Sequence, residues 1–130
     1  MSGNSDHTSL LLQEYLDESL DIIEEIEKVL LELEDQEDQD HLWDCLMRDL
    51  QAFKGSAQLM GLDPIVSLAL SLENIITKYR QDKGVVDHSL TQICSECFEI
   101  VRQLTDEIGR SGTCNKDISP ALNKLEQFSI

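Results

Sequence analysis

The sequence predicts an all-α protein, an antiparallel four-helix bundle followed by a short fifth helix at the C-terminus. Apolar residues recur at helical spacing through four long stretches. An acidic break at residues 35–40 separates the first two stretches, and the later breaks contain glycine or proline. The composition, with 41% hydrophobic but only 5% aromatic residues, suits a helical core of leucine and isoleucine. Short connections between long helices favour antiparallel neighbours. In a chain of 130 residues we expect one bundle domain over residues 9–130, preceded by a flexible tail over residues 1–8.

The first two helices are predicted over residues 9–34 and 41–60, joined by an acidic linker. Thr8 and Asp40 are their candidate N-caps, and Gly61 would end the second helix as a C′ glycine. Their inward-facing apolar residues are Leu12, Leu16, Ile23, Ile26, Leu30 and Leu33 in the first helix, and Leu42, Leu46, Phe53, Ala57 and Met60 in the second.

Three further helices follow, and each start carries a capping signal. Asp63-Pro64 combines a cap with a proline at the first helical position, and Ser119-Pro120 repeats this combination at the fifth helix. Asp87 is the candidate cap of the fourth helix, which we expect to end at Gly109, while Gly84 would close the preceding turn. We expect the fifth helix to pack across one end or side of the bundle. The predicted buried residues are Ile65, Leu68, Leu72, Ile75, Ile76 and Tyr79, then Leu90, Ile93, Cys94, Cys97, Val101, Leu104 and Ile108, then Leu122, Leu125 and Phe128.

The charge of the chain limits its partners. The formal charge is −16 at pH 7, and fifteen of the 26 acidic residues lie between Asp6 and Asp44, where Lys28 is the only lysine or arginine. Such a surface argues against nucleic acid and against membranes of anionic lipid as partners. The sequence has no stretch of 18 apolar residues and no secretory signal, and its four cysteines fit a reducing compartment. We therefore predict a cytoplasmic protein.

The second helix presents a polar face that points away from its buried stripe. At 100° per residue this face holds Asp44, Arg48, Gln51, Lys54, Gly55 and Gln58, flanked by Trp43, Met47 and Leu50. A polar line edged by partly exposed apolar groups suits a docking surface, although an ordinary solvent face has the same pattern. Gly55 favours docking, because a glycine inside a helix costs about 1 kcal/mol relative to alanine. Close approach of a partner, or close packing of a neighbouring helix, would compensate for this cost.

The stretch from Arg48 to Gly61 resembles the signature of histidine-containing phosphotransfer (Hpt) domains, especially the N-terminal phosphotransfer domain of chemotaxis histidine kinases. That family reads Arg-x-x-His-x-x-Lys-Gly, with a second glycine six residues later. Arg48, Lys54, Gly55 and Gly61 match in register, whereas Gln51 occupies the position of the phosphoacceptor histidine.

Two other segments extend this resemblance over nearly the whole chain. Tyr15–Ser19 is similar to the start of the family's first helix, and Leu72-Glu73-Asn74 resembles a Met-Glu-Asn sequence of the chemotaxis kinases. The glutamate of that sequence hydrogen-bonds the reactive imidazole and orients it. The resemblance therefore implies an orienting role for Glu73.

Gln51 removes the chemistry that the resemblance otherwise implies. A histidine can carry phosphate because its neutral imidazole has a nitrogen lone pair available near pH 7. The amide nitrogen of glutamine is delocalised into its carbonyl and is not nucleophilic, although the side chain still donates and accepts hydrogen bonds. We therefore expect no catalytic residue and no enzyme activity. We also expect Gln51 to bond Glu73, with Lys54 alongside.

The sequence gives no reason to expect a metal or another cofactor. Cys94 and Cys97 have the Cys-x-x-Cys spacing of zinc and redox sites, but both also fall on the predicted buried stripe of the fourth helix. Cys45 and Cys114 supply no second pair of ligands. We therefore assign Cys94 and Cys97 to the core, where cysteine is a common small apolar residue.

These observations predict a pseudo-phosphotransfer module of a two-component phosphorelay. It would dock a response-regulator receiver domain or a histidine kinase domain through Trp43, Met47, Leu50, Gln51, Lys54 and Gln58. Two alternatives remain open. One is an active phosphotransfer domain of a chemotaxis-type kinase whose histidine was mutated to glutamine in this chain. The other is a structural helical bundle that does not bind a receiver.

Overall fold

The structure, a computed structural model, describes residues 3–35, 40–82, 86–112 and 115–128. All regular secondary structure in these residues is helical. The five helices are α1 (Gly3–Asp35), α2 (Asp40–Leu59), α3 (Asp63–Asp82), α4 (His88–Ser111) and α5 (Ser119–Gln127). The predicted all-α fold class is confirmed.

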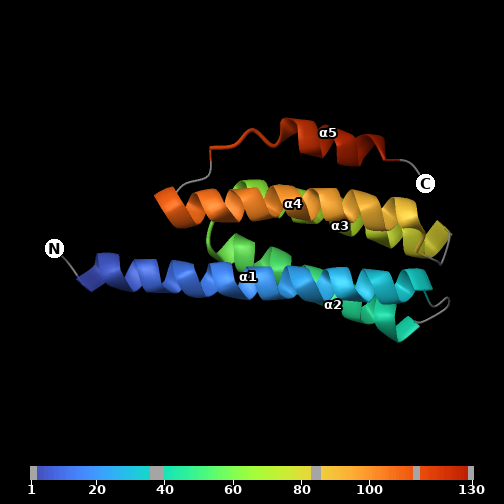
Figure 1. The fold of residues 1–130 in the computed structure, drawn as a ribbon, viewed down its shortest axis with the longest axis horizontal. Helices are drawn as coiled ribbons and strands as arrows, with labels where there is room; N and C mark the ends of the chain where they lie inside the picture. Colours follow the sequence, from blue (N-terminus) through green and yellow to red (C-terminus); the bar gives the residue numbers. More distant parts are fainter. Residues whose placement is uncertain (1–2, 36–39, 83–85, 113–114, 129–130) are drawn as a thin grey trace.

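Helices α1 to α4 form the bundle, and α5 lies along its outside (Figure 1). Both α2 and α4 contact α1 and α3, so that α1 and α3 occupy diagonal positions. α5 contacts α3 and α4 and lies on the side of these helices that is away from α1. Among the described residues, α2 therefore packs against α1 on one side and α3 on the other, and no helix covers its outward side.

The core follows the predicted apolar stripes. All of the apolar residues predicted to be buried in α3 and α4 are buried. Phe53 of α2 and Phe98 of α4 meet edge to face at the centre, with 6.1 Å between their ring centroids. From α5 only Leu125 is fully buried, whereas Leu122 and Phe128 are half-buried against the core. No described helix is long and apolar enough to cross a membrane.

The C-terminus of α2 is fixed by the predicted glycine. Gly61 has a φ of +69°, in the left-handed region. The N–H of Gly61 donates to the carbonyl of Gln58 at 3.1 Å, and the N–H of Leu62 donates to the carbonyl of Ala57 at 3.0 Å. This pair of bonds is a Schellman motif, which satisfies the last carbonyls of the helix. The direction of the chain between α2 and α3 is therefore set by one turn.

A side-chain cap starts α4, as predicted. The carboxylate of Asp87 accepts a hydrogen bond from the N–H of Leu90 at 3.0 Å and from the hydroxyl of Tyr79 at 3.0 Å. Burial and the Asp87 carboxylate raise the pKa of Tyr79 to about 12. The cap thus also ties the start of α4 to α3. Gly84, predicted to close the turn before it, lies outside the described residues.

The predicted start of the first helix is wrong. α1 begins at Gly3, so Thr8 lies inside the helix and does not cap it, and residues 3–8, predicted as a tail, are helical. No proline occurs between Gly3 and Ser9 to stop the helix from extending. Asp40 and Asp63, predicted as caps, are likewise the first residues of α2 and α3.

Two other predicted helix ends also differ. α4 passes through Gly109 and ends at Gly112, which has a φ of +78° and donates its N–H to the carbonyl of Ile108 at 2.7 Å. Gly109 lies inside the helix beside α1, where a Cβ would make an ordinary contact, 3.4 Å from Cδ1 of Leu16. At α5 the N-cap is Ile118, which makes no side-chain cap bond, so Ser119 is not the cap.

We expect Gly61→Ala to lower the free energy of unfolding by about 1 kcal/mol, because a Cβ disfavours the left-handed φ that the Schellman motif needs. Unfolding in denaturant measures this change. Gly55→Ala, at a glycine without positive φ, is the control and should not lower stability. An unchanged unfolding midpoint for Gly61→Ala would contradict the described turn.

Candidate functional site

The polar face predicted on α2 points to solvent in the structure. Its members, which we call the α2 outer face, are Asp44, Arg48, Gln51, Lys54, Gly55 and Gln58. Gln51 is exposed at the middle of this face, and Lys54 and Gly55 beside it are half-buried. Gln51 is therefore accessible from solvent on the α2 outer face.

An ion pair connects this face to α3. Nζ of Lys54 lies 3.0 Å from Oε1 of Glu73, and each side chain is only 16% exposed. Glu73 thus lies beside the α2 outer face, as the resemblance implied. Its partner differs from the prediction, because Gln51 has no side-chain hydrogen bond to any described residue. An ammonium offers a carboxylate a stronger, charge-assisted bond than a neutral amide does.

Trp43 and Leu50 do not belong to the docking surface, contrary to prediction. They are 2% and 1% exposed and form part of the core. The guanidinium of Arg80 in α3 lies 5.9 Å from the centroid of the Trp43 ring, and it pairs with Asp44 at 3.0 Å. α3 therefore covers the side of α2 that the helical wheel placed at the edge. Met47, the third predicted apolar edge residue, is half-buried.

The exposed apolar residues of α2 lie on the side toward α1, opposite the side that packs against α3. They were not predicted from the sequence. Leu59 is 90% exposed and Ala52 is also exposed. Met60, predicted to be buried, is 36% exposed just beyond the last turn of the helix. The helical wheel contained a signal for this surface, because Leu59 and Ala52 fall within about 100° of Gln51. Only the position of α3 shows that this side stays open.

Gly55 is not explained by packing within the chain. An alanine Cβ built at this position meets no atom within 4 Å, so no neighbouring helix requires a glycine here. Its cost inside the helix, about 1 kcal/mol relative to alanine, is not repaid by any contact among the described residues. Close packing of a neighbouring helix, one of the two explanations weighed from the sequence, therefore does not account for this glycine.

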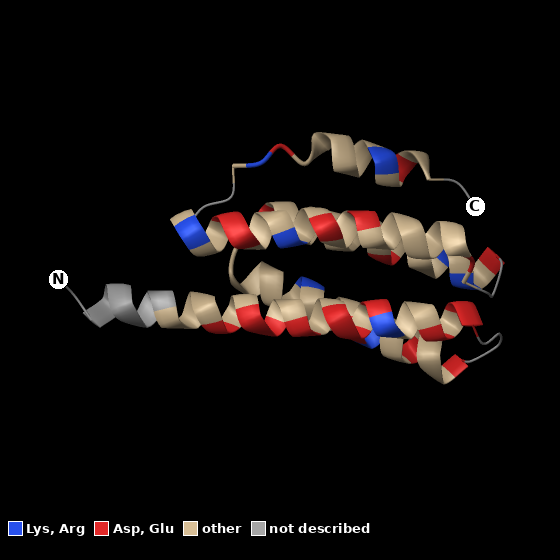
Figure 2. Cartoon of the chain, in the orientation of Figure 1, with Lys and Arg blue, Asp and Glu red and all other residues tan. Residues whose placement is uncertain are grey.

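Carboxylates border the α2 outer face along the seam with α1. Glu18 of α1 accepts a hydrogen bond from the hydroxyl of Ser56 at 3.4 Å. Burial raises the pKa of the Asp49 carboxyl, and the nearby Glu25 carboxylate raises it further. Figure 2 shows that acidic residues continue along α1. The surface beside Gln51 is therefore negative toward α1, whereas Lys54 is neutralised by Glu73 toward α3.

Cys94 and Cys97 are core residues, as predicted. They are 0% and 3% exposed, and burial raises the pKa of both thiols, that of Cys97 to about 12. No group of three or more histidine, cysteine or acidic side chains in the described part of the chain is arranged to hold a metal ion. Cys45 is half-buried on α2, and Cys114 lies outside the described residues.

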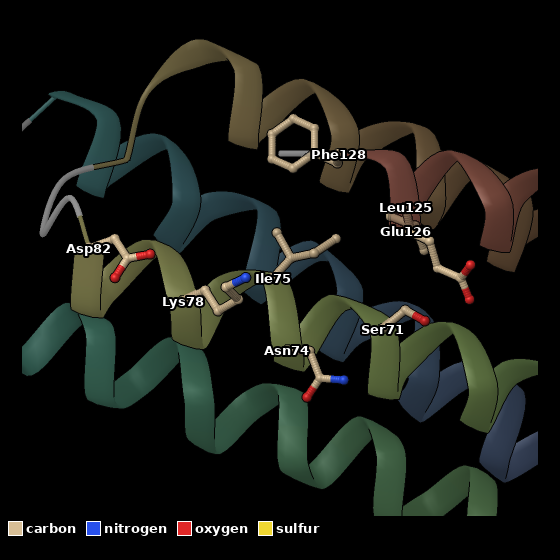
Figure 3. Close-up of a pocket in the computed structure, with 8 residues that line it drawn as sticks. All are labelled: Ser71, Asn74, Ile75, Lys78, Asp82, Leu125, Glu126 and Phe128. Atoms are coloured by element: carbon tan, nitrogen blue, oxygen red, sulfur yellow. The ribbon is translucent and has the colours of Figure 1, made fainter. Parts of the chain in front are cut away.

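A cavity of about 390 Å³ lies on another side of the molecule, between α3 and α5 (Figure 3). Ile75, Leu125 and Phe128 form its apolar wall, and Lys78 and Asp82 lie at its edge. Its charged side chains are exposed, and none of the residues predicted as a site lines it. The candidate site is therefore the α2 outer face and not this cavity.

The sequence profile of the Hpt domain matches residues 10–112, which include all of α2 and α3. The chain belongs to the Hpt domain family. It is 24% identical over 119 residues to the chemotaxis protein CheA of Listeria monocytogenes and of Listeria innocua, covering 92% of this chain and 19% of each relative. It is also 24% identical to the gliding motility regulatory protein of Myxococcus xanthus, covering 92% of this chain and 15% of the relative. The chain thus spans less than a fifth of the length of these relatives.

A solved structure of similar fold is the phosphorylated P1 domain of CheA3 in complex with CheY6 from R. sphaeroides. The TM-score is 0.74 at 23% identity, and the match covers 91% of this chain and 94% of that chain. This Hpt domain therefore has the fold of a chemotaxis-kinase phosphotransfer domain, its short C-terminal helix included. The alignment of Gln51 with the phosphoacceptor histidine stays a prediction from the motif.

In a Cys114→Ser background, we expect Cys45 to react with dithiobis(nitrobenzoate) while Cys94 and Cys97 stay protected, because buried neutral thiols are poor nucleophiles. The absorbance of the released thiolate counts the reactive groups. The same protein in denaturant is the control, and all three thiols should react there. Rapid reaction of all three thiols in the folded protein, or stoichiometric zinc binding, would contradict the assignment to the core.

Proposed function

We propose that this Hpt domain is a cytoplasmic docking module of a two-component phosphorelay that does not itself carry phosphate. It presents the α2 outer face to a response-regulator receiver domain or to a histidine kinase domain. The observation that carries the proposal is the exposure of Gln51 between the Lys54–Glu73 ion pair and the open surface above Gly55. The solved P1 domain in complex with CheY6 makes receiver domains the first partners to test.

The absence of transfer follows from the chemistry of the amide. Phosphoryl transfer to a side chain needs a lone pair that can attack phosphorus, and imidazole has one near neutral pH. The lone pair of an amide nitrogen is delocalised, so Gln51 offers hydrogen bonds but no nucleophile. Docking would then sequester a partner or hold it in an assembly.

We expect no label to pass from a ³²P-phosphorylated receiver domain to the native chain, and an acid-labile phosphoryl group to appear on Gln51→His. The reason is that Lys54 and Glu73 already lie beside position 51, so that an imidazole there would have the setting that the family uses. Gln58→His is the matched control, because it places a histidine at another exposed glutamine of the same helix. Electrophoresis with and without acid treatment measures transfer.

An acid-labile phosphoryl group on the native chain would show that it is an active carrier and would overturn the proposal. Equal labelling of Gln51→His and Gln58→His would show that position 51 is not the specific phosphoacceptor position. Binding of native protein to receiver domains, titrated alongside Lys54→Glu, tests docking without chemistry. The docking proposal fails when neither Gln51 nor Lys54 substitutions change the affinity.

We expect Gly55→Ala to raise the free energy of unfolding by about 0.5–1 kcal/mol, since the added Cβ meets nothing and alanine favours the helix. Gly55→Gln, with a longer side chain on the same surface, should keep the fold and weaken receiver binding by about ten-fold, or 1.4 kcal/mol. Denaturant unfolding and calorimetric titration measure the two effects. Tight binding by Gly55→Gln would show that no partner approaches this position.

A further inference from the structure

We propose that Leu59 is the apolar anchor of the docking surface, and that it enters an apolar pocket of the receiver domain whose rim carries lysine or arginine. The inference rests on the proposed function and names the part of the partner that α2 recognises. Trp43 and Leu50, which were predicted as apolar docking residues, are buried in the core, whereas Leu59 is exposed. Leu59 therefore takes their place in the proposed docking surface.

Leu59 is the most exposed large apolar side chain in the described part of the chain, at 90%. It is the last residue of α2, and the Schellman motif at Gly61 fixes the backbone that follows it. The fold thus holds a fully solvated leucine in a defined place. Burying its side chain against a partner would remove apolar surface from water without any rearrangement of the backbone.

Leu59 lies on the same side of the molecule as Gln51. It follows Gln51 by eight residues, which places it about 12 Å further along the helix axis and about 80° around it. Between them lie Ala52, Gly55 and Ser56, which are small. The half-buried Gly55 leaves empty space above the backbone. A single flat partner surface can therefore contact Gln51 and Leu59 together.

The charges along the seam between α1 and α2 indicate the charge of the partner surface. Glu18 bonds Ser56, three residues before Leu59, and Glu25 and Asp49 continue this acidic seam away from Leu59 toward the start of α2. Arg48 forms no ion pair with a described carboxylate, but its charge opposes the rise in the pKa of the adjacent Asp49 carboxyl, and its guanidinium lies 3.5 Å from Sγ of Cys45. Three carboxylates against one guanidinium favour a basic partner surface. They also oppose a second copy of this chain, whose charge is −16.

The test measures affinity for purified receiver domains of the same organism. We expect Leu59→Asn to weaken binding at least about ten-fold, as loss of a central apolar anchor does. Leu31→Asn is the matched control, because Leu31 is also an exposed leucine, at 60%, but lies on α1 away from the α2 outer face. It should stay within about two-fold of the native affinity. Both leucines are too exposed for the change to unfold the domain.

A second pair of variants tests the basic rim. Glu18→Lys combined with Glu25→Lys should lower the association rate about ten-fold at low salt and flatten its salt dependence. Glu126→Lys on α5, at an exposed position on the other side of the bundle, is the charge control and should leave the rate within about two-fold.

The outcomes separate the two proposals. Gly55→Gln and Lys54→Glu could weaken binding while Leu59→Asn and Leu31→Asn bind with the same affinity. In that case the assignment of Leu59 as the anchor is wrong and the proposed function stands. Faster association of the variant that combines Glu18→Lys with Glu25→Lys would overturn the inference that the partner's pocket has a basic rim. When native protein binds no receiver domain, the proposed function fails and the anchor fails with it. Self-association that depends on Leu59, seen by sedimentation equilibrium, would identify a second copy as the occupant and overturn the receiver assignment.

Discussion

The packing of α3 against one side of α2 determines which residues of α2 stay exposed. Arg80 covers Trp43 and pairs with Asp44 at one end of this contact, and Lys54 pairs with Glu73 near its middle. The apolar edge residues Trp43 and Leu50 are buried on this side. The outward surface of α2 therefore consists of residues such as Gln51, Gly55 and Leu59. The Asp44 side chain is 72% exposed, so the Arg80–Asp44 pair contributes little to stability. The importance of these contacts lies in the side of α2 that they cover.

The two borders of α2 differ in charge. Toward α3 the one lysine is matched by one glutamate, so that border is close to neutral. Toward α1 the carboxylates of Glu18, Glu25 and Asp49 have one arginine nearby. A partner that docks on α2, as proposed, would meet a surface that is negative on one border and close to neutral on the other. Electrostatic asymmetry of this kind orients an approaching protein before close contact forms.

The helices and the core could be predicted from the sequence because both depend on local periodicity and capping. The stripes of α3 and α4, the turn at Gly61 and the cap at Asp87 needed no knowledge of distant residues. The edge of α2 could not be predicted, because the burial of Trp43 depends on Arg80, which lies 36 residues after Asp44 in the chain. The choice between Gly109 and Gly112 as the end of α4 also depends on which glycine has the positive φ, and both permit it.

A module that docks without transfer acts only through differences in affinity. A ligand shifts an equilibrium between two states of its partner by no more than the ratio of its affinities for them. Under the proposed function, Gln51 would offer hydrogen bonds from a neutral side chain, much as an unphosphorylated imidazole does, and would stay unmodified during the encounter. An anchor at Leu59 would lie about 12 Å along the helix from position 51 and so would not contact the group at that position. Discrimination between the states would then come from Gln51, Lys54 and Glu73, while the strength of docking would come from the surface that ends at Leu59.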